Sequence, residues 1–225
     1  MSRNSTLVIA PHPDDESLGA GGFISRLTKS GEKVSVLTVA GHLPPIYQDE
    51  DYEKTKLEAS KAYGILGIDN SYFLDIPATY VNEVPISNLN KKITEILELT
   101  KPSRVLIPFP DRHLDHRLVF ESAMVVCRPS SPVGKNILEV LAYETLSETH
   151  WNAPQIEPNF YPNYFVDISA DIESKVRAIS AYESQIPPAP GPRSVDAVRA
   201  LATFRGSQVG VAAAEAYQLI RKFRA

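Results

Sequence analysis

The chain has 225 residues and a formal net charge of −4 at neutral pH, with 43% hydrophobic and 22% charged residues, as is typical of a globular protein with a sizeable core. The slightly acidic balance argues against nucleic acid as a partner, since it provides no basic field to attract one. No run approaches the ~18 apolar residues of a membrane span, the N-terminus lacks the apolar core of a secretory signal, and the single Cys127 excludes an intrachain disulfide. We therefore expect a cytoplasmic protein without an integral membrane segment.

The first half of the chain alternates short apolar runs with segments whose apolar residues recur at helical spacing. The expected strands are residues 6–10, 33–39, 71–74 and 104–108. The expected helices are residues 17–30, 53–66, 86–99 and 116–127. In the second of these helices Leu57, Ala62, Ile65 and Leu66 are expected to face the core. This alternation predicts an α/β fold, a Rossmann-like and mostly parallel sheet with helices on both faces.

The second half is less regular. We expect strands at residues 137–143 and 164–167 and helices at residues 172–182 and 212–223, the last because it is rich in alanine. Residues 185–193 (QIPPAPGPR) contain four prolines, which remove hydrogen-bond donors and fix backbone angles, so this segment is expected to be a surface loop that covers a site. Without internal repeats or a convincing boundary, residues 1–225 are interpreted as a single domain.

Two short polar clusters carry most of the chemical information. Residues 11–16 (PHPDDE) follow the first predicted strand, and residues 111–116 (DRHLDH) follow the fourth. In a doubly wound sheet of order 3-2-1-4 these two strands are neighbours, and ligands bind outside their carboxyl ends. The two clusters are therefore expected to meet in one crevice.

The residue types in these clusters suit a hydrolytic metal centre. Zinc in hydrolases typically takes three protein ligands from histidine and carboxylate, and it lowers the pKa of a bound water towards ~7. His12, Asp15 and His116 are the candidate ligands, with Fe(II) open as an alternative to zinc because two histidines and one carboxylate suit it as well. Asp14 is the candidate general base, and His113 is the candidate for stabilising the oxyanion or protonating the leaving amine.

Each cluster by itself also has an ordinary structural interpretation. The acidic residues 14–16 suit the N-cap and first turn of a helix, and His113 and His116 suit a solvated helix start. The occurrence of both clusters after adjacent strands favours the metal site. Glu16 is expected to support the loop of residues 11–16. The glycines of residues 19–22 lie too far beyond the strand of residues 6–10 for a dinucleotide-binding turn, so close packing of the helix explains them better.

The sequence resembles a known family. Residues 10–22 (APHPDDESLGAGG) closely resemble the signature of the LmbE-like, or PIG-L, N-acetyl-sugar deacetylases, and residues 113–117 (HLDHR) are similar to its HxDH segment. Further similar segments are residues 58–67, 182–185, 205–206 and 214–217. The resemblance implies zinc-dependent removal of the acetyl group from an N-acetylglucosamine-type substrate or its conjugate. It also implies the same roles for His12, Asp15 and His116 as ligands, Asp14 as base and His113 as the group assisting the tetrahedral intermediate.

The sequence departs from the family pattern on the substrate side. Residues 39–45 (VAGHLPP) replace a Thr-Asp-Gly or Thr-Asn-Gly turn, and the arginine often found ahead of the Glu58 equivalent is missing. His42 and Arg205 are the candidate substrate contacts, although a solvent-facing loop histidine is an alternative for His42. The expected partner is a small-molecule amino sugar, and a homo-oligomer stays open. The alternatives are a metal-dependent hydrolase of another amide or ester and a catalytically silent sugar- or metal-binding module.

Overall fold

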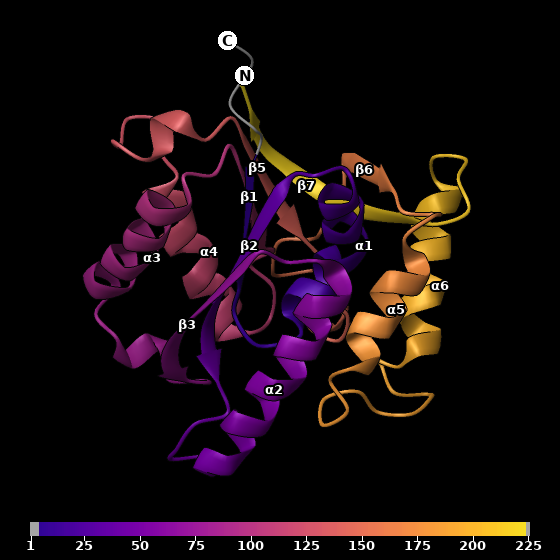
Figure 1. The fold of residues 1–225 in the computed structure, drawn as a ribbon, viewed down its shortest axis with the longest axis horizontal. Helices are drawn as coiled ribbons and strands as arrows, with labels where there is room; N and C mark the ends of the chain where they lie inside the picture. Colours follow the sequence, from indigo (N-terminus) through magenta and orange to yellow (C-terminus); the bar gives the residue numbers. More distant parts are fainter. Residues whose placement is uncertain (1–4, 224–225) are drawn as a thin grey trace.

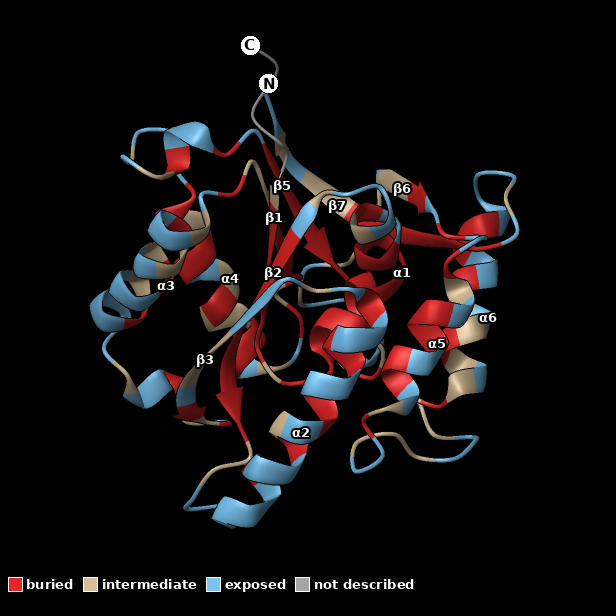
Figure 2. Cartoon of the chain, in the orientation of Figure 1, coloured by how far each residue is buried: buried red, intermediate tan, exposed pale blue. Residues whose placement is uncertain are grey.

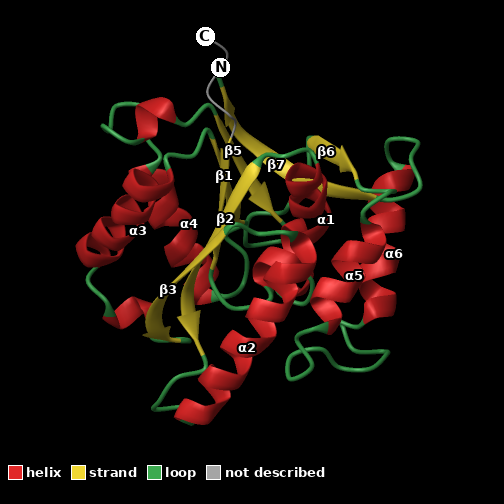
Figure 3. Ribbon diagram, viewed as in Figure 1, coloured by secondary structure: helices red, strands yellow, loops and turns green. Residues whose placement is uncertain are grey.

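The computed structural model describes residues 5–223, and in this part of the chain a seven-stranded sheet has the order β3-β2-β1-β4-β5-β7-β6 (Figures 1 and 3). The strands are β1 (Ser5–Ala10), β2 (Lys33–Gly41), β3 (Asn70–Pro77), β4 (Arg104–Pro108), β5 (Glu139–Tyr143), β6 (Tyr164–Asp167) and β7 (Ala214–Lys222). The helices are α1 (Asp15–Lys29), α2 (Asp49–Leu66), α3 (Ile86–Thr100), α4 (Leu114–Val126), α5 (Ile172–Ser180) and α6 (Val195–Ser207). The α/β fold and the strand order 3-2-1-4 predicted for the first half are confirmed.

The sheet is covered on both faces. Helices α1, α2, α5 and α6 lie on one side and α3 and α4 on the other (Figure 1). Strand β1 shows the principle: Val8 packs into the core under α1 and α2, while Leu7 and Ile9 pack into the core under α3 and α4. Because both faces of the sheet are covered, β1 and β2 are buried along almost their whole length, as Figure 2 shows.

The C-terminal expectation was wrong. Residues 214–222 form strand β7, which runs antiparallel to both β5 and β6, instead of a helix. Local alanine content favoured a helix, but the free edge of β5 takes up the backbone hydrogen bonds of this segment. The carboxylate of Glu215 also accepts hydrogen bonds of 2.8 Å from the backbone amides of Gly22 and Phe23 in α1, so the strand is fixed to the helix layer as well.

Two further details differ from expectation. Leu57 and Ile65 are exposed, at 66% and 37%, because the buried face of α2 runs through Ala59, Ala62 and Leu66 and does not include them.

Helix α6 was not predicted. Its signal is an N-cap serine: the side chain of Ser194 accepts a hydrogen bond from the amide of Ala197, and Asp196 lies in the first turn.

The glycines of α1 are explained by close packing, as expected. A Cβ atom on Gly19 would lie 2.1 Å from the ring of Tyr143, and one on Gly22 would lie 2.7 Å from Ile168. Cys127 is free and buried in the core under α3 and α4. Within residues 5–223 no helix combines the length and apolar character needed to cross a membrane.

Candidate active site

The two polar clusters lie together at the carboxyl ends of β1 and β4, which are adjacent parallel strands. They border a cavity of about 210 Å³, whose lining includes His12, Asp14, Asp15, His113 and His116. Residues that follow β2, β3 and β5, and both ends of segment 185–193, complete the walls. All five residues to which the sequence assigned a metal or catalytic role are therefore in one cavity.

Three side chains that could bind a metal lie close together at the floor of this cavity. Oδ2 of Asp15 lies 3.3 Å from Nδ1 of His12 and also 3.3 Å from Nε2 of His116. The His116 Nε2 atom is buried and has no hydrogen-bond partner among the described residues. A buried ring nitrogen without a partner is unfavourable, and a cation between these groups would satisfy it. Two imidazoles and one carboxylate are a suitable set for zinc with an open position, so the residues present fit a metal.

In both His12 and His116, the ring nitrogen that faces away from Asp15 is hydrogen-bonded to a buried carboxylate. Nε2 of His12 bonds Oδ2 of Asp115 at 2.9 Å, and Nδ1 of His116 bonds Oδ2 of Asp111 at 3.1 Å. Such partners hold a proton on the far ring nitrogen and leave the near nitrogen with a lone pair for a cation. Asp111 also accepts hydrogen bonds from the amide of His113 at 3.0 Å and from Oγ1 of Thr149 at 2.9 Å. Asp111 and Asp115 were not predicted as site residues, although both lie in the second cluster.

The electrostatics of this floor favour positive charge. Burial disfavours imidazolium, yet hydrogen bonds to Asp115 and Asp15 raise the pKa of His12 to about 9. The charge of Asp15 and the hydrogen bond to Asp111 likewise raise the pKa of His116 to about 10, against the effect of burial. Burial opposes ionisation of Asp15, but the two histidines hold the pKa of its carboxyl well below the usual range. Positive charge is thus stabilised between these side chains, and a divalent cation would take the place of the proton on the near nitrogen of each histidine.

Asp14 occupies the N-cap of α1, but its side chain makes no capping hydrogen bond. Its carboxylate instead accepts a hydrogen bond of 3.0 Å from Nη1 of Arg193. Its φ of 106° is in the left-handed region, which costs a non-glycine residue about 1–3 kcal/mol and is found mainly at functional sites. Glu16 holds this conformation by accepting from the Asp14 amide at 3.3 Å, and burial together with the charge of Asp15 raises the pKa of the Asp14 carboxyl.

His113 is the N-cap of α4, and its Nδ1 accepts a hydrogen bond of 3.2 Å from the amide of Asp115. Burial and the neighbouring His12 and His116 lower the pKa of His113 to about 4, so the ring is neutral at neutral pH. A neutral imidazole that accepts at Nδ1 carries its proton on Nε2. The ligand atoms of His12, His113 and His116 lie within 4.8 Å of one another, which makes His113 an alternative third ligand. With its proton on Nε2 it lacks a lone pair there and is better suited to donate a hydrogen bond.

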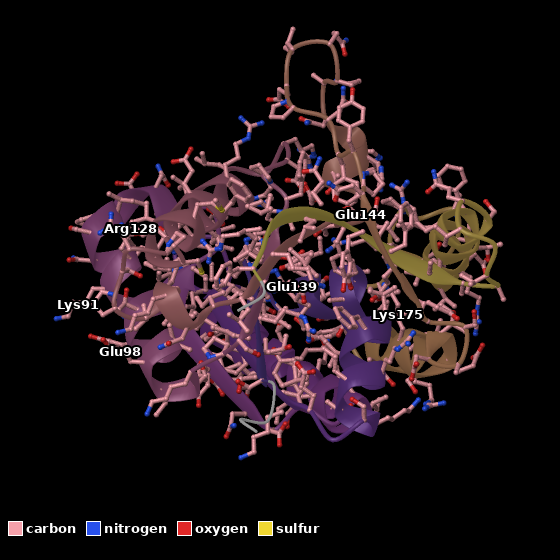
Figure 4. The ribbon with its side chains drawn as sticks, turned by 90° about the horizontal axis from the view of Figure 1, so that it is seen from above. Lys91, Glu98, Arg128, Glu139, Glu144 and Lys175 are labelled. Carbon is pink, nitrogen blue, oxygen red and sulfur yellow. The ribbon has the colours of Figure 1, made fainter. Side chains whose placement is uncertain are left out.

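The two candidate substrate contacts are separated. His42 lines the cavity, where its ring lies 4.4 Å from that of Tyr47 and its Nδ1 is 3.3 Å from Oγ1 of Thr55. Arg205 is not among the lining residues. It is buried and forms two hydrogen bonds of 2.8 and 2.6 Å with the carboxylate of Glu144, which is labelled in Figure 4.

The proline-rich segment borders the cavity through its two ends, Gln185 and Arg193. Just before it, Ser184 donates to the carboxylate of Glu58 through its amide at 3.1 Å and its hydroxyl at 2.6 Å. The hydroxyl of Tyr182 donates to Glu16 at 2.7 Å. Arg193 was not predicted as a site residue, because no local sequence pattern distinguishes one loop arginine from another.

The chain is similar to proteins of a known family. Residues 7–127 match the model of the PIG-L family, described as GlcNAc-PI de-N-acetylase. The chain is 32% identical over 195 residues to the diacetylchitobiose deacetylase of Thermococcus kodakarensis, covering 80% of this chain and 70% of that protein.

Solved structures share the fold. The N,N′-diacetylchitobiose deacetylase of Pyrococcus horikoshii superposes with a TM-score of 0.79 at 24% identity, over 98% of this chain and 85% of that one. A 4-carboxy-2-hydroxymuconate hydratase of Pseudomonas putida superposes with a TM-score of 0.75 at 20% identity, over 99% and 98% of the two chains. The fold is thus compatible with more than one reaction, but the family match spans both polar clusters. The chain belongs to the PIG-L family.

Proposed function

We propose that the protein is a metal-dependent hydrolase that removes the acetyl group from an N-acetylglucosamine-type sugar or its conjugate. The observation that carries the proposal is the position of Asp15 Oδ2, 3.3 Å from a ring nitrogen of both His12 and His116. This triad lies beside Asp14 and His113, which supply an acceptor and a donor at the same cavity. The names of the family and of its deacetylase relatives support an N-acetylated sugar as substrate.

His12, Asp15 and His116 would hold the metal, with zinc favoured by the donor set and Fe(II) as the alternative. A divalent cation at this position supplies positive charge that polarises the amide carbonyl and makes a water more acidic. Asp111 and Asp115 hold the two imidazoles in the tautomers that such a site needs.

Asp14 accepts a proton from the attacking water as the new carbon–oxygen bond forms. Its raised pKa makes it a stronger base than an exposed aspartate. The Nε2–H of His113 donates a hydrogen bond to the carbonyl oxygen as negative charge develops there. When the carbon–nitrogen bond breaks, the proton held by Asp14 passes to the departing amine, so that water and amide give acetic acid and amine, which become acetate and ammonium at neutral pH.

The test is acetate release by zinc-loaded protein from N-acetylglucosamine, N,N′-diacetylchitobiose and nucleotide- or lipid-linked N-acetylglucosamine. We expect acetate and free amine in equal amounts from at least one of these, with activity lost to a chelator and restored by zinc. An acetate ester assayed in parallel detects a general esterase. Release of acetate from the ester alone would contradict the proposal, as would full activity in metal-free protein.

A further inference from the structure

Arg193 is distant in sequence from both polar clusters, yet it reaches the cavity and donates a hydrogen bond of 3.0 Å from Nη1 to Oδ2 of Asp14. Among the lining residues in the described part of the chain it is the only lysine or arginine. We propose that Arg193 is a positioning residue that fixes the orientation of the Asp14 carboxylate towards the attacking water. This inference rests on the proposed function.

Apart from Arg193, little holds the side chain of Asp14 in place. Its backbone is fixed, because the amide donates to Glu16 and the carbonyl accepts from the amides of Ser17 and Leu18 at 3.0 and 2.8 Å. These contacts set the position of Cα but leave the rotation of the carboxylate free. Within residues 5–223, only Arg193 donates a hydrogen bond to that carboxylate. Since Asp14 is 2% exposed, its carboxylate would be buried and poorly hydrated without this partner.

Arg193 is also attached to a well-packed part of the chain. The next residue, Ser194, is buried and caps α6, and its amide donates to the carbonyl of Gly191 at 3.0 Å. Pro187 packs directly on Gly191, where a Cβ would lie 2.4 Å from the proline ring. A support this tightly packed can hold a guanidinium in one place, and misplacement of a catalytic group by ~1 Å is enough to cost about 10²-fold in rate.

The contact with Asp14 uses only part of the hydrogen-bonding capacity of Arg193. A guanidinium has five N–H donors, and only one of those of Arg193 is used on a protein group in the described chain. A lysine ammonium can provide one such bond, so charge and hydrogen bond can be retained in a conservative variant. The Arg193 side chain is 32% exposed, so a small cation from solution can reach its position when the side chain is removed.

We test the proposal with Arg193→Ala and Arg193→Lys in zinc-loaded protein. In the alanine variant we expect kcat to fall about 10- to 100-fold, with KM within about threefold of wild type and metal content unchanged. The lysine variant should recover most of the lost kcat, and millimolar guanidinium ion should restore part of the activity of the alanine variant. The matched control is Arg199→Ala, which removes an α6 guanidinium that binds the exposed Glu173 at 2.6 and 2.7 Å, and which should retain wild-type kinetics.

Crystal structures of the zinc-loaded wild type and Arg193→Ala provide a readout independent of activity. We expect the Asp14 carboxylate to be rotated or split between conformers in the variant, with His12, Asp15 and His116 unmoved. An unmoved carboxylate would overturn the proposal, and so would a raised KM with unchanged kcat, because Arg193 would then bind substrate. Loss of metal would instead assign Arg193 to the metal site. If the wild type releases no acetate the proposed function fails, while the two structures still decide whether Arg193 orients Asp14.

Discussion

His113 and His116 are three residues apart, but their hydrogen bonds favour different tautomers and therefore different roles. Nδ1 of His116 faces the carboxylate of Asp111, which leaves Nε2 with a lone pair and no partner in the described chain. Nδ1 of His113 accepts from the amide of Asp115, which leaves Nε2 with the proton. We therefore expect His116→Ala to lose bound metal, and His113→Asn to keep the metal and turn over slowly.

The magnitudes follow from these contacts. His116→Ala leaves His12 and Asp15, which is fewer than the three protein donors of a typical catalytic zinc site. Loss of one hydrogen-bond donor to an oxyanion costs about 10²–10³ in kcat, or about 2.7–4 kcal/mol. Asparagine is chosen at position 113 because it can continue to cap α4, whereas alanine would lose a cap worth about 0.5–2 kcal/mol. Its side chain is too short to reach the position of the imidazole Nε2.

The assay combines three measurements on each variant: metal per chain after gel filtration, kcat from acetate release, and the thermal midpoint. We expect His113→Asn to hold about one metal ion per chain and to melt within about 3 °C of the wild type. So small a shift in the thermal midpoint means that the free energy of unfolding is little changed. A folded His113→Asn protein without metal would refute the reasoning, because His113 would then be a ligand and its proton would not be on Nε2.

Three further predictions concern single residues. Asp14→Asn should retain fold and metal while slowing acetate release by about 10²–10⁴-fold, because an amide cannot accept the proton of water; near-normal turnover would assign the base to another group. Asp111→Asn should weaken zinc binding by about 10- to 100-fold in a competition with a chromophoric chelator, since an amide cannot accept hydrogen bonds from His116, His113 and Thr149 together. Asp167→Asn at the surface is the control, and equal zinc affinities of the two variants would contradict this prediction. Burial raises the pKa of Cys127 to about 12, so between about pH 9 and 12 the unfolded chain releases a thiol proton that the folded chain retains, and stability should fall as pH rises. Cys127→Ala should reduce this slope in urea unfolding series at several pH values, and an unchanged slope would show that Cys127 is not protected.

Local sequence patterns determined much of this protein. Strands β1 to β4 lie in a sheet whose two faces are covered by helices. The strands therefore appear in the sequence as apolar runs, and the helices between them as segments with apolar residues at helical spacing. The two polar clusters could be located at the ends of β1 and β4 for the same reason, since in a parallel α/β sheet functional residues follow the carboxyl ends of strands. Their residue types predict a metal site, with His12, Asp15 and His116 as candidate ligands and Asp14 and His113 as candidate catalytic groups.

The tertiary structure decided what depends on partners distant in the chain. Residues 214–222 have alanine-rich local preferences, but pairing with β5 and β6 makes them a strand. The orientation of the His12 ring depends on the carboxylate of Asp115, 103 positions away, and Asp15 reaches His116 only because β1 and β4 are adjacent. Arg205 was singled out from the sequence but is bonded to Glu144, while Arg193 reaches Asp14 from 179 positions away. No local pattern records such a pairing, because it exists only once the helix and sheet layers have packed and brought the proline-rich segment to the cavity.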